Sequence, residues 1–586
     1  MTASDARTLA QDLVRRSDDA LAALFSARQI SPTVGWNDAF DAAEALLEPA
    51  ALERALVGLT ADEVAVLTAG APAPAGVLTD GLRERGLLDE QGLPYDAVSA
   101  AIDAVAARAA ASIVVPDGAP ADHDAAAAAA PGDARAAERA FASLGSLADI
   151  LHAALTHPFA RIGAGTLGAA DRRRLIETGI VDDPTAADEL MVIAERTGML
   201  AGQDKTWAVT ARGAHWLHTD TVSRWAEVAH ALLQGLPRGV RRDDGGGLAL
   251  SAWAGAYPFD PSWPARAATL RSLLRRWALL DDAGGPTTWA RPAFGGAVTD
   301  GSTADALALD ALASLLPGEV DRVYLQNDLT AIAPGPLAPR FDMRLRSMAH
   351  RESHAQASTY RFTAETIADA LTGGESADSL REFLTTLSLT GLPQPLEYEI
   401  ERTARTHGTV RVGPDELGRT RVTSEDEALL RTLAVDQALR PLGLVPDGGV
   451  LVSRSGPDTA FWMIADARYP VVAVDADGHR RRLDRHRLAA EPASPTPARE
   501  RYALLLARLR SAPSGDADAA WLGRELDQAV RARAAIIVSV RMPDGTDREF
   551  TIEATGLGGG RLRGLDRNVD VERTLPVSSI SGIRPA

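Results

Sequence analysis

Four segments of the sequence close a helical stretch in the same way, and this repetition constrains the fold more than any other feature. In each segment, residues with apolar side chains at helical spacing lead into a turn of small residues and then an apolar pair. The four endings are RGLLD at 85–89, RTGML at 196–200, RWALLD at 276–281 and LRPLGLV at 439–445. A helix that closes in this way passes readily into a short strand.

Strand-like sequence follows two of these endings. Residues 206–210 (TWAVT) alternate like a strand, and a Gly284-Gly285-Pro286 turn precedes residues 287–289. A helix followed by a two-stranded wing is the winged-helix arrangement, a variant of the helix-turn-helix. We therefore predict several degenerate winged-helix units ahead of the central part of the chain. The alternative is a common packing unit with no role on DNA, since winged helices also serve as protein-docking modules.

The composition indicates a chain of several domains. The length of 586 residues suggests about three to five domains, and a hydrophobic fraction of 46% suffices for packed cores. The sequence has no cysteine, which excludes disulfides and thiolate metal sites. No apolar run is long enough to span a bilayer, and the first residues lack a signal-peptide core. We therefore expect a cytoplasmic protein without a membrane partner, and association with the nucleoid stays open.

The charge balance limits how this chain could bind DNA. Its formal net charge is −18, so the whole molecule is repelled by phosphates. Local cationic patches still act within a screening length of about 8 Å. DNA binding must therefore be argued patch by patch.

Two stretches of biased composition divide the chain. Residues 115–135 are rich in Ala, Asp and Pro without large apolar side chains, which predicts a flexible linker. Residues 491–500 contain EPASPTP and form a second predicted linker. The predicted domains are a helical, winged-helix-like domain, further winged-helix-like units, a central domain and a helix with a small β-barrel, at 1–114, 136–300, 304–490 and 501–586.

The stretch from residue 323 to residue 413 alternates short strands and helices. Apolar runs predict strands at 323–325, 329–333 and 360–362, and helical spacing predicts a helix from residue 339 to about residue 354. Thr363 is the predicted N-cap of the next helix. This pattern indicates a compact α/β domain with few long loops.

The same stretch resembles a known family. The resemblance lies in QNDLT at 326–330, APGPL at 333–337, STYRFT at 358–363 and LPQPL at 392–396. These segments are similar to the domain that precedes the motor in XPB-type DNA helicases, which many actinobacteria carry on a separate, motor-less helicase-associated protein. Asn327 departs from the proline expected there. The resemblance continues weakly to WMI at 462–464 and RYPV at 468–471. The resemblance implies a module for DNA engagement or protein docking and implies no catalytic role.

The last fifty residues change character. Apolar residues alternate at 536–540 and again at 550–552 around a Pro-Asp-Gly turn, which predicts a β-hairpin. The tail at 573–583 resembles the end of the small β-barrel of WYL domains, although LRGL at 562–565 stands where the WYL tripeptide is expected. The expected fold class is α+β and mainly helical, with tandem winged-helix-like units, a central α/β helicase-associated domain and a small C-terminal β-barrel.

No segment predicts a catalytic centre. A helicase motor needs the P-loop G-x-x-x-x-G-K-[ST], but the chain's only lysine is Lys205, preceded by Asp204 where the second glycine belongs. An aspartate there would repel the phosphates. The glycine-rich run 556–560 leads into strands, which favours a turn over a dinucleotide cradle. His215 and His218 lack the carboxylate of H-E-x-x-H, so we expect no metal site and no cofactor.

Arginine clusters are the candidates for nucleic-acid binding, because the guanidinium fork suits phosphate oxygens. The first cluster is expected on the helix from residue 339, where a spacing of four and seven residues would form one stripe. The second is the densest run, the third lies near the C-terminus, and a weaker fourth precedes a predicted wing. The clusters are Arg340, Arg344, Arg346 and Arg351 with Arg361 and Arg402; Arg480, Arg481, Arg482, Arg485 and Arg487; Arg561, Arg563 and Arg567; and Arg271, Arg275 and Arg276. The alternative for each is a solvated face paired with the many Asp and Glu side chains.

Two functions follow from these patterns. The first is a non-catalytic DNA-binding accessory protein that holds duplex or forked DNA for repair or transcription, which the family resemblance favours. The second is a scaffold that docks a separate helicase motor or RNA polymerase with little DNA contact, which the acidic balance favours. An unrecognised hydrolase is a distant third.

Overall fold

The computed structural model describes residues 3–112, 130–163, 165–241, 250–295, 307–352, 357–481, 483, 488–490, 496–511, 517–542 and 545–586. In these described parts of the chain, helices dominate and four small sheets accompany them, which confirms the predicted α+β, mainly helical class. Among the described residues, no helix combines the length and apolar character needed to cross a bilayer. The chain folds into two compact units, described in turn below.

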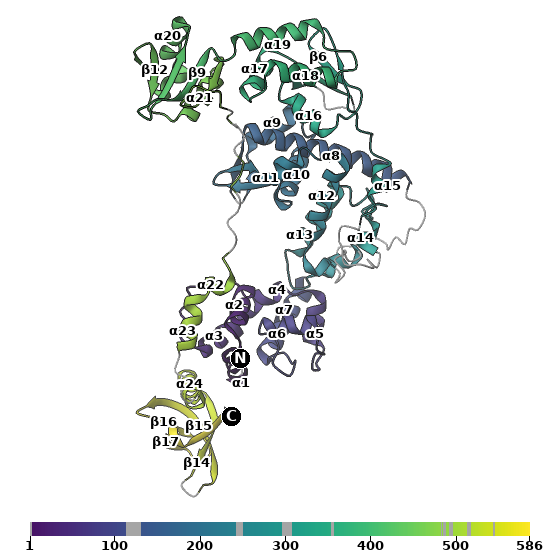
Figure 1. Cartoon of the computed structure of the whole chain (residues 1–586). Helices are drawn as coiled ribbons and strands as arrows, with labels where there is room; N and C mark the ends of the chain where they lie inside the picture. The colour runs from purple at the N-terminus through teal and green to yellow at the C-terminus, as the bar shows by residue number, and fades with distance from the viewer. Residues whose placement is uncertain are drawn as a thin grey trace. The chain divides into compact units, whose positions relative to one another are not determined.

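The first unit joins the two ends of the chain: 1–118, 255–263 and 494–586. Its helices α1 to α7 pack around buried side chains such as Leu9, Phe25 and Leu46. The late helix α23 returns to this bundle and buries Leu505 and Leu506 in the same core (Figure 1). The helices are α1 (Ala3–Arg15), α2 (Asp18–Ala27), α3 (Ala39–Leu47), α4 (Pro49–Val57), α5 (Ala61–Thr68), α6 (Val77–Glu84), α7 (Asp96–Ser112), α22 (Ala498–Arg501), α23 (Ala503–Ser511) and α24 (Ala517–Ala532).

A five-stranded antiparallel sheet ends the first unit, in the order β17-β16-β15-β14-β18. The predicted hairpin is confirmed, since β14 pairs with β15 from Arg541 back to Ala535. The predicted closed barrel is wrong for the described residues, because the edge strands β17 and β18 do not pair with each other. The elements are β14 (Ala535–Arg541), β15 (Asp547–Gly558), β16 (Arg561–Asp566), β17 (Val571–Pro576), η5 (Val577–Ser579) and β18 (Ile580–Pro585).

In the second unit, residues 130–209 form a helix, a strand pair, two helices and a hairpin. Strand β1 pairs with β4, so the sheet order is β2-β1-β4-β3. The RTGML ending behaves as predicted: α10 ends at Arg196, Gly198 takes a left-handed φ of 71°, and β3 follows. Helix α8 begins at Ala130, inside the predicted linker 115–135; residues 113–129 lie outside the described residues.

The RGLLD and RWALLD endings lead into less strand than predicted. Each closes its turn with a single β-bridge, Leu88 with Pro94 and Leu280 with Pro286. The wing predicted after RWALLD does not form among the described residues. After Pro286 the chain returns to helix, and Trp289 is buried. The elements of this half are α8 (Ala130–Thr156), β1 (Phe159–Ile162), β2 (Thr166–Leu167), α9 (Ala169–Glu177), α10 (Pro184–Arg196), β3 (Leu200–Gln203), β4 (Thr206–Val209), α11 (Ala211–Trp216), α12 (Thr221–Gln234), η1 (Arg238–Val240), η2 (Leu250–Gly255), α13 (Trp263–Arg276), α14 (Arg291–Gly295) and α15 (Leu309–Ala313).

Hydrogen bonds between buried tryptophans link α12 to the end of α13. The indole N–H of Trp225 donates to the Trp277 carbonyl at 3.0 Å, and the indole N–H of Trp277 donates to the Trp225 carbonyl at 3.0 Å. Trp289 donates to the Ala278 carbonyl at 2.9 Å. Because every one of these indole N–H groups has a partner, the rings can be buried without the cost of an unpaired donor.

The central stretch forms a lobe, residues 323–406, with its own core of buried side chains from Val323 to Ile400. Its sheet has the order β5-β6-β8-β7. Thr363 caps α17 as predicted, in a reciprocal capping box with Thr366. The elements are β5 (Tyr324–Leu325), β6 (Thr330–Ala333), α16 (Pro339–Arg346), β7 (His350–Arg351), β8 (Ser358–Arg361), α17 (Ala364–Thr372), α18 (Ala377–Leu387) and α19 (Gln394–Thr406).

A second lobe, residues 410–473, has a separate core that includes Val410, Leu433 and Phe461. Its five-stranded sheet has the order β11-β12-β10-β9-β13, and β13 runs parallel to β9. The LRPLGLV ending leads, as predicted, into a short strand, here β11. The elements are β9 (Val410–Pro414), β10 (Thr420–Ser424), α20 (Glu427–Val435), η4 (Gln437–Leu442), β11 (Val445–Asp447), β12 (Val450–Ser453), α21 (Pro457–Asp466) and β13 (Val471–Ala473).

Candidate nucleic-acid interface

The predicted arginine stripe does not lie on one helix. Helix α16 ends at Arg346, well before residue 354, and Arg351 lies on strand β7. Pro339 starts the helix where its missing N–H costs nothing, and three basic residues in a helix of eight leave little apolar surface to extend it. Arg340 and Arg344 therefore share α16, and the third member of the stripe belongs to the sheet.

Arg344 and Arg361 both form carboxylate pairs. The Arg344 guanidinium holds Glu375 with two N–O distances of 3.0 Å and lies 4.4 Å from the Phe383 ring centre. Arg361 holds Glu352 and remains about half exposed. These contacts match the alternative that the sequence left open, in which arginines are neutralised by nearby acids.

Arg351 belongs to a buried network of ion pairs and hydrogen bonds that links the central lobe to α8. The Arg346 guanidinium lies 2.6 Å from Asp149 of α8, and Arg351 lies 3.4 Å from the same carboxylate. The side chain of Asp149 is 4% exposed and that of Arg346 is 10% exposed. The Tyr360 hydroxyl donates to Asp342 at 2.6 Å, and Asp342 lies 3.7 Å from Arg346. This network is structural, because its charges face one another and not the solvent.

Arg340 is arranged differently. It lies exposed in the first turn of α16, and its guanidinium is 4.6 Å from the ring centre of Phe341. Among the described residues, no carboxylate forms an ion pair with it. A cation near a helix N-terminus also gains nothing from the helix dipole. Arg340 is thus available to an external anion.

The dense run 480–487 is described only in part. Arg480 is exposed, forms no ion pair with a carboxylate in the part of the chain that the structure describes, and lies beside His407 and Gly408. Arg481 pairs with Asp458. Arg482, Arg485 and Arg487 lie outside the described residues.

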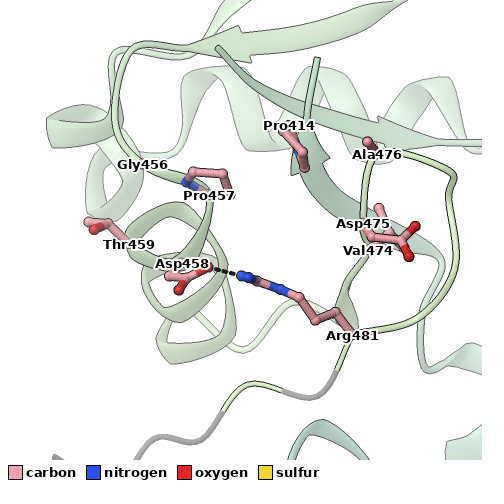
Figure 2. A pocket seen from close by; sticks show the side chains of 9 residues that line it. All are labelled: Pro414, Gly456, Pro457, Asp458, Thr459, Val474, Asp475, Ala476 and Arg481. Atoms are coloured by element: carbon pink, nitrogen blue, oxygen red, sulfur yellow. Dashed lines mark hydrogen bonds and ion pairs between the residues drawn. The ribbon is translucent and has the colours of Figure 1, made fainter. Parts of the chain in front are cut away.

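Figure 2 shows the Arg481 side chain reaching toward Asp458 at the first turn of α21, across a pocket of about 450 Å³. Asp475, Asp477 and His479 lie close by, with possible ligand atoms within 4.8 Å of one another. This cluster has a local cause, since Asp475 accepts hydrogen bonds from the backbone N–H groups of Asp477 and His479 in a turn. The three side chains are exposed, and the grouping follows from the turn alone.

The weaker cluster on α13 is engaged within the fold. Arg276 lies 2.6 Å from Glu189 of α10, and Arg275 donates to the backbone carbonyls of Asp281 and Asp282. Arg271 donates to the Leu250 carbonyl and lies 5.9 Å from the Trp253 ring centre. All three stabilise the turn and the helices around it. In the tail, Arg567 holds Glu553 at 2.6 Å.

A cleft of the second unit lies between the two lobes and the helices α8 and α11. It has a volume of about 1090 Å³, and we call it the interlobe cleft. Four arginines of the first predicted cluster line it: Arg340, Arg344, Arg346 and Arg402. It also receives side chains that the sequence did not single out for binding, among them His407, Trp462, Arg468 and Tyr469.

His407 follows α19 and is 7% exposed. Burial, with the nearby charge of Arg480 as a second cause, lowers its pKa to about 4. The imidazole forms a hydrogen bond with the Leu371 backbone, and its Nε2 has no partner. No local signal distinguishes this histidine in the sequence. Trp462 and Tyr469 fall in WMI and RYPV segments where the family resemblance continues weakly, and that was the one available hint.

Lys205 lies in the turn between β3 and β4, where Gln203 pairs with Thr206. Asp204 takes a left-handed φ of 52°, as tight hairpin turns require. The segment thus forms a β-hairpin, in which the chain after Lys205 continues as strand β4.

Comparison with known proteins adds one match. Residues 323–446 match the family model described as a helicase conserved C-terminal domain. The matched segment covers the first lobe and part of the second, including much of the interlobe cleft wall. It supports a helicase-related, nucleic-acid-associated role for this part of the chain. A comparison with curated proteins finds no match.

Proposed function

We propose that this chain is a non-catalytic accessory protein of the helicase-associated type, which engages DNA in repair or transcription and supplies no motor. One observation carries the proposal: a helicase-type segment at 323–446 belongs to a chain whose only lysine lies in a β-hairpin turn. Without a lysine behind a glycine-rich loop, the chain has no P-loop to hold nucleotide phosphates. The XPB-type assignment of this segment is part of the same proposal.

The topology of residues 130–209 supports a DNA-related ancestry. The segment has a helix, a strand, two helices and a hairpin, with the first strand paired to the last, and this order of elements is compatible with a winged helix. The helix that would enter a groove is α10, however, and its exposed positions include Asp188 and Glu195 beside Arg196. Such a face repels phosphates. The proposal therefore assigns DNA contact to the lobes and not to α10.

Arg340 and Arg480 are the cations that best fit this assignment. Neither forms an ion pair with a carboxylate among the described residues, whereas Arg344, Arg361 and Arg481 do. Moving a paired arginine onto a phosphate would leave a carboxylate uncompensated, which offsets much of the gain. An unpaired arginine carries no such cost.

Two observations support a second function, that of a docking scaffold. Most of the predicted DNA-binding arginines that the structure describes are already paired or bonded to carbonyls, and the net charge is −18. Both facts favour a scaffold that docks a separate helicase motor or RNA polymerase with little direct DNA contact.

Binding of labelled duplex and forked DNA, followed by fluorescence anisotropy across a salt series, separates the two functions. For the accessory protein we expect affinity that falls steeply with salt, and a shallower salt slope in the Arg340→Gln/Arg480→Gln double variant, by about one per lost phosphate contact. The matched control is Arg405→Gln/Arg531→Gln, which removes two exposed arginines that face acids on their own helices.

Absence of binding to either DNA at low salt, with co-purification of a motor or polymerase, would reject DNA engagement and favour the scaffold.

Nucleotide hydrolysis tests the non-catalytic part separately. The purified chain should show no ATP or GTP turnover above the buffer background, with or without DNA. Turnover that persists through further purification and is carried by this chain would overturn the proposal.

A further inference from the structure

We propose that the interlobe cleft binds an unpaired stretch of nucleic acid, with bases among its aromatic side chains and phosphates on its arginines. The inference rests on the proposed DNA engagement and specifies the strand that is bound. The cleft volume of about 1090 Å³ exceeds the roughly 300–1000 Å³ of pockets for single small ligands, so it has room for more than one nucleotide.

The first argument is the unused hydrogen-bonding capacity of His407. The side chain is more than nine-tenths buried, lines the cleft, and has a lowered pKa that keeps it neutral at pH 7. One ring nitrogen is engaged by the Leu371 backbone, which leaves Nε2 as an acceptor without a partner. Buried polar atoms are nearly always satisfied, so this atom calls for a donor from a ligand. Nucleobase N–H groups are such donors.

The second argument is the pair of aromatic side chains on the second lobe. Trp462 of α21 and Tyr469 both line the cleft, and both are half-buried. The Tyr469 hydroxyl donates to Asp436 at 2.7 Å, which fixes the orientation of the ring. Aromatic platforms of this kind stack on unpaired bases, at about 1–3 kcal/mol per base. The bases of a duplex are stacked on each other and cannot use them.

The third argument is the number and state of the cations. Arg340 forms no ion pair with a described carboxylate, and Arg468 lies 3.8 Å from Glu365 and 4.0 Å from Asp369, both longer than a direct hydrogen bond. Glu365 and Asp369 also line the cleft, so its charge is mixed. A duplex brings two closely spaced rows of phosphates and needs a broad cationic face. A cleft that has few available cations and aromatic rings beside them suits one strand better. The composition of the cleft lining therefore favours a single strand over a duplex.

The test compares a labelled 15-nucleotide single strand with the same sequence as a duplex, by anisotropy at low salt with the full chain. We expect tighter binding of the single strand. Trp462→Ala should weaken it by about 5- to 150-fold, which corresponds to the loss of one stacked base, while Trp462→Phe should retain most of the affinity. Arg405→Gln, on α19 but outside the cleft lining, serves as the control. Thermal melting of each variant excludes loss of fold as the cause.

The outcomes separate this inference from the proposed function. Equal binding of duplex and single strand, unchanged by Trp462→Ala, overturns the cleft inference and leaves DNA engagement standing. If the parent chain binds neither the single strand nor the duplex, both the cleft inference and the proposed DNA engagement are wrong. If the cleft variants release a bound protein partner and leave oligonucleotide binding intact, the cleft is a protein site and the inference is wrong.

Discussion

Single side chains in this protein are governed by what faces them across the fold. Arg340 and Arg344 are four residues apart on α16, yet Arg344 holds Glu375 and stacks on Phe383, while Arg340 meets no described carboxylate. The pKa of His407 is likewise set by residues distant from it in the sequence, through its burial and the nearby charge of Arg480. The chemistry of each group was therefore set by its neighbours and not by its residue type.

His407 predicts a pH dependence of stability. Its pKa is lowered from 6.5 to about 4 in the folded protein, so between these values the unfolded chain takes up a proton that the folded chain does not. The free energy of unfolding should therefore fall as the pH drops from about 6.5 toward 4. Urea unfolding at pH 7.5 and pH 5 should show a smaller drop in His407→Gln than in the parent chain.

His479→Gln is the control for this effect, since His479 is exposed at the tip of a turn. If His407→Gln leaves the pH dependence of stability unchanged, the assignment of His407 as a buried, neutral histidine is wrong.

At the level of elements, the contact between α8 and α16 includes a buried network of charged side chains. Asp149 receives Arg346 and Arg351, and Asp342 links Arg346 to Tyr360. Breaking a buried pair on one side leaves an uncompensated charge, which costs more than the pair contributed. The long helix α8 thus connects the first half of the second unit to the helicase-like lobe.

Asp149→Ala should destabilise the second unit by about 3–5 kcal/mol, because it leaves two arginines without their carboxylate. Tryptophan fluorescence during urea unfolding follows the change. Asp188→Ala provides the comparison: its pair with Arg172 is half-exposed, and we expect a loss of about 1 kcal/mol or less.

Combining Asp149→Leu with Arg346→Met and Arg351→Met should recover much of the stability, since no charge is left unpaired. Similar small losses for Asp149→Ala and Asp188→Ala would show that the network is not buried.

At the level of the whole molecule, the late helices complete the first core. Tyr502 of the turn before α23 stacks edge-on against Phe25, with ring centres 5.7 Å apart, and its hydroxyl donates to the Ile30 carbonyl at 2.8 Å. Leu505 and Leu506 are buried in the same cluster as Leu9 and Leu24. Residues nearly five hundred positions apart therefore share one hydrophobic core.

A chain truncated after residue 493 lacks α22 and α23, so the core of the first bundle should be exposed. Its residues 3–112 should then be cleaved faster by a protease than in the full chain. A chain truncated after residue 511 retains α22 and α23 and should keep the bundle protected. Limited proteolysis followed by mass spectrometry measures both. Equal cleavage of the two truncations would contradict a structural role for α23.

Local sequence patterns by themselves determined a good part of this protein. The RTGML and LRPLGLV endings, the Thr363 cap and the hairpin from β14 to β15 all depend on neighbouring residues, so periodicity and turn chemistry predicted them. Tertiary structure alone decided which arginines are neutralised, that α23 joins the first bundle, that β17 and β18 do not pair with each other, and that His407 and Trp462 share a cleft. The physical reason is that burial and electrostatic pairing depend on which side chains meet in space, and those partners are far apart along the chain.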